Sequence, residues 1–67
     1  MKASYDRHTD TLSIVFRPES PVETSEEVRP GVVIDFDLSG RVVSLEMLDA
    51  SRMIAEADRM EFDAVGG

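Results

Sequence analysis

Alternating apolar and polar residues mark the strands that this sequence predicts. The clearest runs are 11–16, 32–37 and 42–47, where apolar side chains occupy every second position. This period is typical of strands with one face towards a core. A shorter run, 2–5, alternates weakly, and the polar residues 6–10 that follow are rich in turn formers. Runs 2–5 and 11–16 therefore predict a hairpin.

The segment 22–28 allows two interpretations. Its glutamates would suit a helical turn, whereas Val22, Thr24 and Val28 would suit an exposed edge strand. Pro30 ends either element, because proline lacks a backbone donor. We favour the strand, since charge on an edge strand discourages aggregation between sheets.

The register between 32–37 and 42–47 can be predicted from the side-chain faces. The apolar residues of both runs share a face if Ile34 lies opposite Val43 across a four-residue turn, Asp37 to Gly40. Gly40 would supply the left-handed backbone conformation of that turn. A three-residue loop with a bulge would instead set Ile34 against Ser44. We predict the four-residue turn.

The period changes after Asp49, a residue that suits the N-cap of a helix. Apolar residues then recur at helical spacing: Ala50, Met53, Ile54, Ala57 and Met60. The pattern predicts an α+β fold. We expect four to five antiparallel strands in a meander of hairpins, with one C-terminal helix packed on one face. Residues 1–60 would form this single domain, and 61–67 a flexible tail.

Composition narrows the classes of function. The 67 residues include no cysteine and one histidine, and the formal net charge is -7. An acidic chain repels phosphate backbones, so we expect no direct nucleic-acid binding, and no apolar run is long enough for a membrane span. We expect a cytoplasmic protein, and the acidity would attract a basic protein partner.

Apolar residues also stand on the predicted second face of the sheet. They are Val15, Val33, Val42 and Leu48. Neighbouring exposed apolar residues mark interfaces, and a chain this short has only a small core of its own. We therefore predict an interface at these four residues and expect a homodimer.

Two groups of polar residues are candidates for chemistry. Asp35, Asp37 and Glu46 could hold a hard cation or form an acid–base pair, since all three are predicted on one face. The second group comprises Asp6, His8 and Asp10. Alternating carboxylates are also typical of a half-solvated strand, and the second group lies in a predicted turn. We therefore predict no catalytic, cofactor or metal site.

Several motifs together resemble a known family. They are Tyr5-Asp6, Asp10 and Leu12, then Glu27-Val28, Pro30 to Asp37, Gly40 to Val43 and Leu45 to Ser51. In this order they resemble the small prokaryotic family known as domain of unknown function 2283, from Met1 to about Ser51. Ser13 stands where the family commonly has an aromatic residue, and Ser44 where glycine often stands. Both departures concern packing.

The resemblance implies a compact β-rich fold with a helix and no established activity. Some members resemble the small partner in pairs of the toxin–antitoxin type. Kinship does not determine function. Together with the net charge and the apolar residues of the second face, the resemblance favours an interaction module that binds a basic protein and has no catalytic activity. The alternative is an enzyme, cation-dependent or acting on a small molecule, that uses Asp35, Asp37 and Glu46.

Overall fold

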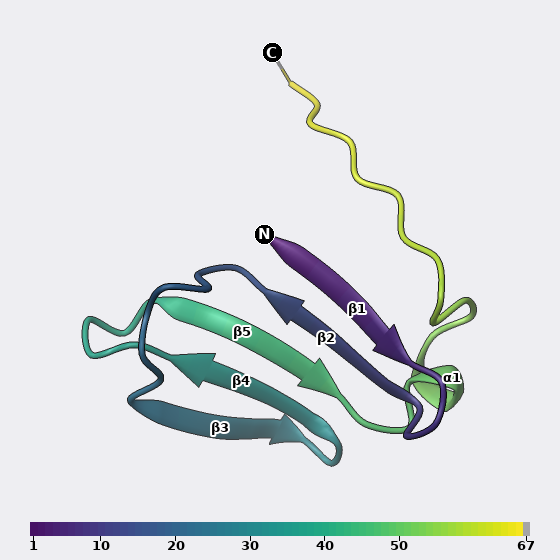
Figure 1. The fold of residues 1–67 in the computed structure, drawn as a ribbon, viewed down its shortest axis with the longest axis horizontal. Helices are drawn as coiled ribbons and strands as arrows, with labels where there is room; N and C mark the ends of the chain where they lie inside the picture. The colour runs from purple at the N-terminus through teal and green to yellow at the C-terminus, as the bar shows by residue number, and fades with distance from the viewer. Residues whose placement is uncertain (67) are drawn as a thin grey trace.

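The computed structural model describes residues 1–66 and shows one open antiparallel sheet with a short helix (Figure 1). The strands are β1 (Lys2–Asp6), β2 (Thr11–Val15), β3 (Thr24–Arg29), β4 (Val32–Phe36) and β5 (Val42–Met47), and the helix is α1 (Ala50–Met53). Gly67, the last residue of the predicted tail, lies outside the described residues. The α+β fold class is confirmed.

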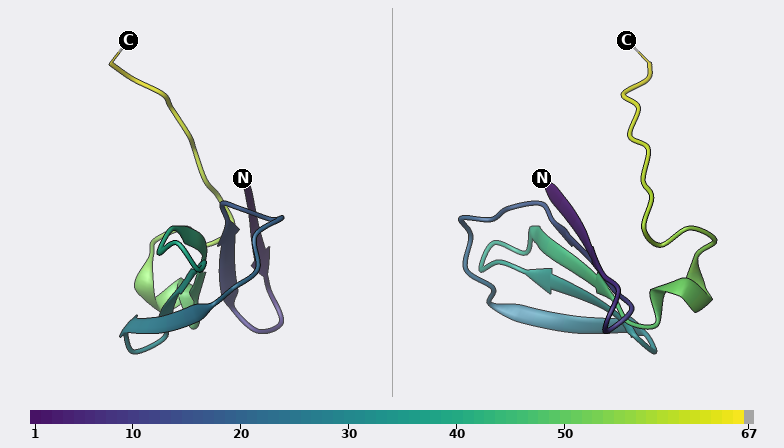
Figure 2. Two further views of the ribbon diagram at one scale, coloured as in Figure 1. Left: turned by 90° about the vertical axis from the view of Figure 1, so that its left-hand side faces the viewer. Right: turned by 45° about the vertical axis from the view of Figure 1, so that its right-hand side comes forward.

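The strand order is β1-β2-β5-β4-β3, and every neighbouring pair is antiparallel. The chain forms the hairpin β1–β2, crosses to the far edge, and returns through β3, β4 and β5 to pair with β2. The strand interpretation of 22–28 is confirmed by β3, which is exposed at every residue. The sheet is strongly twisted and curved, as two further views show (Figure 2).

The predicted register between β4 and β5 is wrong. Ile34 lies opposite Leu45, not Val43, and Phe36 lies opposite Val42. Five residues connect the two strands. The ends of that turn are joined by the Asp37 amide, which donates to the Arg41 carbonyl at 2.9 Å. Gly40 has the expected left-handed conformation, with φ of 82°.

Two changes of one residue each make up the shifted register: a fifth residue in the turn and a β-bulge at Val43. Between the pairs Asp35–Ser44 and Phe36–Val42, Val43 is the extra residue on β5. Its carbonyl oxygen accepts hydrogen bonds from the amides of Phe16 at 2.8 Å and Arg17 at 3.1 Å. The bulge thus turns the Val43 carbonyl towards the segment that crosses from β2 to β3. The alternation of side chains along β4 and β5 does not predict this contact.

One face of the sheet, the core face, carries two apolar rows. Cross-strand pairs place Leu12, Met47 and Val32 in one row and Ile14, Leu45 and Ile34 in the other. The predicted core face is therefore correct for these six residues. Within residues 1–66, the buried hydrophobic residues are Leu12, Val43 and Ala50. The remaining members of the two rows are only partly buried, so the core is small.

The predicted helix is much shorter than its pattern suggested. α1 ends at Met53 instead of Met60, because Ile54 is already extended. Asp49 occupies the N-cap position, but its φ is 51° and its side chain makes no capping hydrogen bond. A narrow stripe of small side chains gives a short isolated helix little packing energy. Residues 54–66 contain no further helix or strand. No helix in the described part of the chain could span a membrane.

Candidate functional site

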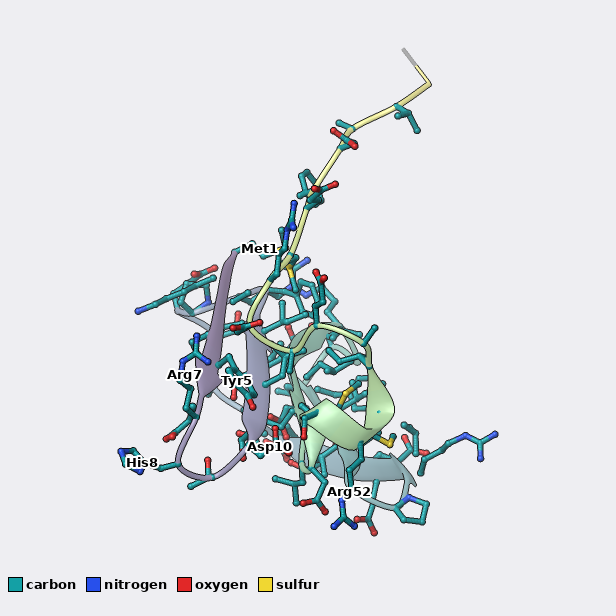
Figure 3. The ribbon with its side chains drawn as sticks, turned by 90° about the vertical axis from the view of Figure 1, so that its right-hand side faces the viewer. Met1, Tyr5, Arg7, His8, Asp10 and Arg52 are labelled. Atoms are coloured by element: carbon teal, nitrogen blue, oxygen red, sulfur yellow. The ribbon has the colours of Figure 1, made fainter. Side chains whose placement is uncertain are left out.

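The predicted polar turn 6–10 contains two aspartates with different tasks. Asp6 accepts hydrogen bonds from the amides of His8 at 2.9 Å and Thr9 at 3.3 Å, as expected for a turn. His8 is exposed and points away from the sheet (Figure 3). The interpretation of Asp6 and His8 as turn residues is therefore confirmed.

Asp10 instead holds the helix. Its carboxylate accepts hydrogen bonds from the Ser51 amide at 3.0 Å and the Ser51 hydroxyl at 2.6 Å, although the residues are 41 positions apart. It also accepts one from the Tyr5 hydroxyl at 2.5 Å (Figure 3). Its carbonyl accepts the amide of Ala50. Asp10 thus caps α1 from another part of the chain, the role predicted for Asp49.

The hydrogen bonds of this junction shift two pKa values. Those from Ser51 and Tyr5 lower the pKa of the Asp10 carboxyl below its ordinary value of 3.8. The same bond to Asp10 raises the pKa of Tyr5 above its ordinary value of 10.0. Each shift favours the protonation state that the pair uses at neutral pH, a charged acceptor and a neutral donor. Sequence reasoning missed this site because no local spacing relates residues so distant.

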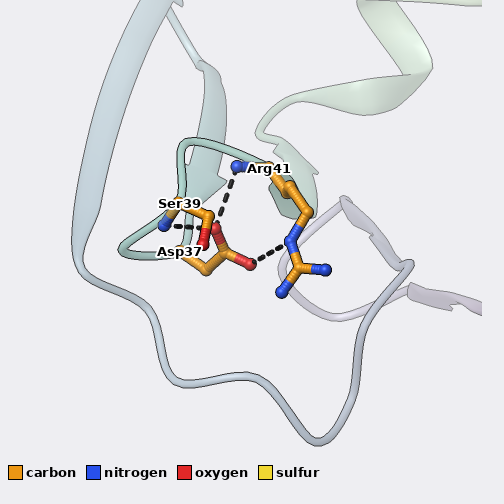
Figure 4. A network of polar contacts seen from close by, with 3 residues as sticks. All are labelled: Asp37, Ser39 and Arg41. Carbon is orange, nitrogen blue, oxygen red and sulfur yellow. Dashed lines mark hydrogen bonds and ion pairs between the residues drawn. The ribbon is translucent and has the colours of Figure 1, made fainter.

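Asp37 is used inside its own turn (Figure 4). Its side chain is 7% exposed and accepts hydrogen bonds from the amides of Ser39 and Arg41, each at 2.9 Å. The Arg41 Nε donates to the second carboxylate oxygen, also at 2.9 Å. The Arg41 amide is the largest cause of a lowered Asp37 pKa. Asp37 therefore shapes the turn and does not face Asp35 and Glu46.

Asp35 lies on the other face of the sheet, here called the second face. Its carboxylate accepts hydrogen bonds from the Ser25 hydroxyl at 2.5 Å and the Ser44 hydroxyl at 2.6 Å. These bonds lower the pKa of Asp35, and the bond from Ser25 contributes most. Glu46 is exposed on the same face, two residues along β5 from Ser44. Within residues 1–66, no three His, Asp or Glu side chains are placed to hold a metal ion.

The four predicted interface residues do not form one patch. Val15 and Val33 lie on the second face, where they pair with Ser44 and Glu46. Leu48 follows β5 at the end of that face and is 46% exposed, beside an open depression lined by residues of β1 and β2. Val42 is paired with Phe36 by the bulge, so it belongs with the core face.

Carboxylates stand on both sides of Val33. The register of β3 places Glu27 directly opposite Val33, and the register of β5 places Glu46 opposite it on the other side. Opposite residues in a sheet share a face, so the valine stands between two acidic side chains. The second face is thus a mixed surface of carboxylates, serines and a few apolar groups.

One protein-family model matches most of the chain. Residues 2–51 match the family model described as protein of unknown function (DUF2283). The chain belongs to this family. The matched region covers all five strands and ends at Ser51, so this DUF2283 region includes both halves of the Asp10–Ser51 junction. No curated protein and no solved structure matches the chain.

Proposed function

We propose that the protein is an acidic interaction module without catalytic activity, which binds a basic protein through the second face. The observation that carries this proposal is Val33 between Glu27 and Glu46 on three neighbouring strands. Interfaces combine an apolar centre with a polar rim of complementary charge. A partner with an apolar anchor between lysines or arginines would match this arrangement.

The rest of the second face supports the same kind of partner. Val15 and Leu48 add apolar surface on either side of the acidic row. Asp35 adds a further carboxylate to this face, and the Ser25 and Ser44 hydroxyls stabilise its charged form and lower its pKa. The net charge of -7 would speed the association of a basic partner at low salt. Such a partner could be toxin-like, as the family resemblance suggests.

A homodimer is proposed on different grounds. Ile14, Ile34 and Leu45 form an apolar row on the core face and are only partly buried. A second copy packed on this face would cover the row, whereas pairing through the second face would bring like carboxylates together. Sedimentation at micromolar concentration should show a dimer. A clean monomer would remove this part of the proposal.

The test of the basic partner uses three versions of the full chain as bait in native lysate. They are the natural chain, Val33→Lys and the charge-matched control Ser39→Lys, which alters the exposed β4–β5 turn. Captured proteins are identified by mass spectrometry, and the affinity of each is then measured with purified protein. Val33→Lys should weaken binding at least about tenfold, and Ser39→Lys should leave it nearly unchanged.

A second variant guards against misfolding of Val33→Lys. Glu46→Lys keeps the apolar side chain and reverses one charge of its rim, so it should reduce mainly the association rate and its salt dependence. Circular dichroism checks that each variant is folded. If all three baits retain the same proteins, or if the retained proteins are acidic, the second face is not the binding surface.

A further inference from the structure

β1 is an outer strand of the sheet, and among residues 1–66 it pairs with β2 alone. The chain returns to the end of this strand after α1, where the Arg7 guanidinium and the Asp58 carboxylate form an ion pair at 2.9 Å. From that corner, the residues up to 66 lead away from the sheet on the β1 side (Figures 1 and 2). The free edge of β1 and the extended segment after Asp58 therefore meet at this corner.

The segment 59–64 has the pattern of a strand. Met60 and Phe62 alternate with Glu61 and Asp63, and the two apolar side chains are 51% and 74% exposed. Strict alternation of this kind is typical of a strand with one face on a core. Within residues 1–66 the segment has no strand partner, and Met60 and Phe62 are largely exposed to water.

We propose that segment 59–64 binds the free edge of β1 in the same molecule, as a sixth antiparallel strand. The Arg7–Asp58 ion pair supplies the first point of the register. Continuing from it along an antiparallel pair places five further residues of each segment opposite one another: Asp6–Arg59, Tyr5–Met60, Ser4–Glu61, Ala3–Phe62 and Lys2–Asp63.

This register puts every side chain on a suitable face. Tyr5 and Ala3 pair with Leu12 and Ile14 on β2, so they belong to the core face. Their new partners would be apolar, Met60 opposite Tyr5 and Phe62 opposite Ala3. The small side chain of Ala3 leaves room for the Phe62 ring over the sheet. A shift by one residue would move both apolar side chains to the second face.

The charges agree with the same register. Lys2 and Asp6 belong to the second face, since they pair with Val15 and Thr11. In the proposed strand, Lys2 would face Asp63 and Asp6 would face Arg59, and opposite charges across a strand pair are favourable. The segment would also close the β1 edge against pairing with other chains, and Met60 and Phe62 would widen the core face.

Engineered disulfides test the register. The chain has no cysteine, so two introduced thiols would be the only ones present. Ser4→Cys with Glu61→Cys joins positions that the proposal sets opposite one another. Ser4→Cys with Ala64→Cys is the control, because residue 64 would lie farther along and on the other face. The first pair should form a disulfide within one chain at least about fivefold faster.

Each other outcome overturns the proposal. Equal rates for the two pairs would mean that the segment has no register on β1. Covalent dimers as the main product would mean that the segment binds a second copy. If the variants fold poorly, nuclear Overhauser contacts between Ala3 and Phe62 in the natural chain decide the matter. They should be present at low protein concentration, and their absence would show that the strand does not form.

Discussion

Asp10 and Asp37 both lie at turns, and both accept hydrogen bonds from backbone amides. The donors to Asp37 are its near neighbours in the chain, whereas the amide donor to Asp10 is far away in the chain. Asp37 holds the amides of Ser39 and Arg41 within its own turn. Asp10 holds the amide and hydroxyl of Ser51, 41 positions away. The same chemistry therefore closes a local turn in one region and joins distant segments in the other.

The difference shows which contacts can be read from a pattern. A turn with Asp at its first position and Gly40 near its end is local chemistry, and neighbouring residues suffice to locate it, although not to give its length of five residues. The Asp10 junction depends on the path of five strands, which carries Ser51 back to the first hairpin. The N-terminus of α1 is then capped by a residue of that hairpin, while the adjacent Asp49 makes no cap hydrogen bond.

The largest expected effect is the loss of the Asp10 carboxylate. Asp10→Ala should expose the amides of residues 50–54 to rapid hydrogen exchange and lower Tm on the order of 10 °C, because α1 loses its cap and its tie to the hairpin. Asp37→Ala should leave exchange at 50–54 unchanged and affect the β4–β5 turn alone. Equal loss of protection at 50–54 in both variants would contradict the comparison.

A second variant keeps the backbone conformation and one acceptor oxygen at this position but removes the charge. Asp10 has φ of 55°, a left-handed conformation that asparagine tolerates and alanine does not. Asp10→Asn should therefore lower Tm less than Asp10→Ala. Ser51→Ala, which removes only the hydroxyl donor, should have a smaller effect again.

The pH dependence should distinguish the two regions at high pH. The carboxyls of Asp10 and Asp37 have lowered pKa values, so their stabilisation is complete above 3.8 and is lost as the pH falls through the folded values. The raised pKa of Tyr5 has the opposite sign: its stabilisation is complete below 10.0 and is lost as the pH rises through the folded value. Both regions should weaken in acid, and only the Asp10 junction in alkali.

Chemical denaturation at several pH values checks this expectation, with Tyr5→Phe as the control. This variant should remove the additional loss of stability above pH 10, since it has no phenol to ionise. Its loss of stability in acid should become smaller but persist, because the Tyr5 bond to Asp10 is gone while the Ser51 bonds remain. If Tyr5→Phe loses as much stability above pH 10 as the natural chain, a group other than Tyr5 causes that loss.

The smallest effect concerns the local turn. Gly40 has φ of 82°, and an added Cβ would meet no atom within 4 Å, so Gly40→Ala carries a conformational cost alone. We expect about 1 kcal/mol less free energy of unfolding. Gly66 also has a positive φ and open surroundings, but it lies outside any turn of the sheet, so Gly66→Ala should change nothing. Equal effects of the two substitutions would contradict a local role for Gly40.

Much of the fold could be predicted because a strand pattern is local. Alternation located the strands and assigned Leu12, Ile34 and Leu45 to one face, since each side chain's environment follows from its own position. The pairing of Ile34 with Val43 failed for two reasons. The turn has five residues, and Val43 forms a bulge whose carbonyl accepts hydrogen bonds from the crossing segment. The helix was too long in the prediction because helical spacing cannot show whether a surface exists for Met60 to cover.

By itself, the sequence determined four of the strands and favoured the fifth at 22–28. It also determined their apolar face, the left-handed conformation of Gly40 and the acidic charge, because each depends on residues close together in the chain. The tertiary structure alone decided the strand order, the bulge at Val43 and the end of α1 at Met53. It also brought Asp10 to Ser51. These features depend on which groups come into contact across the folded sheet, and a local sequence pattern does not show contacts between distant residues.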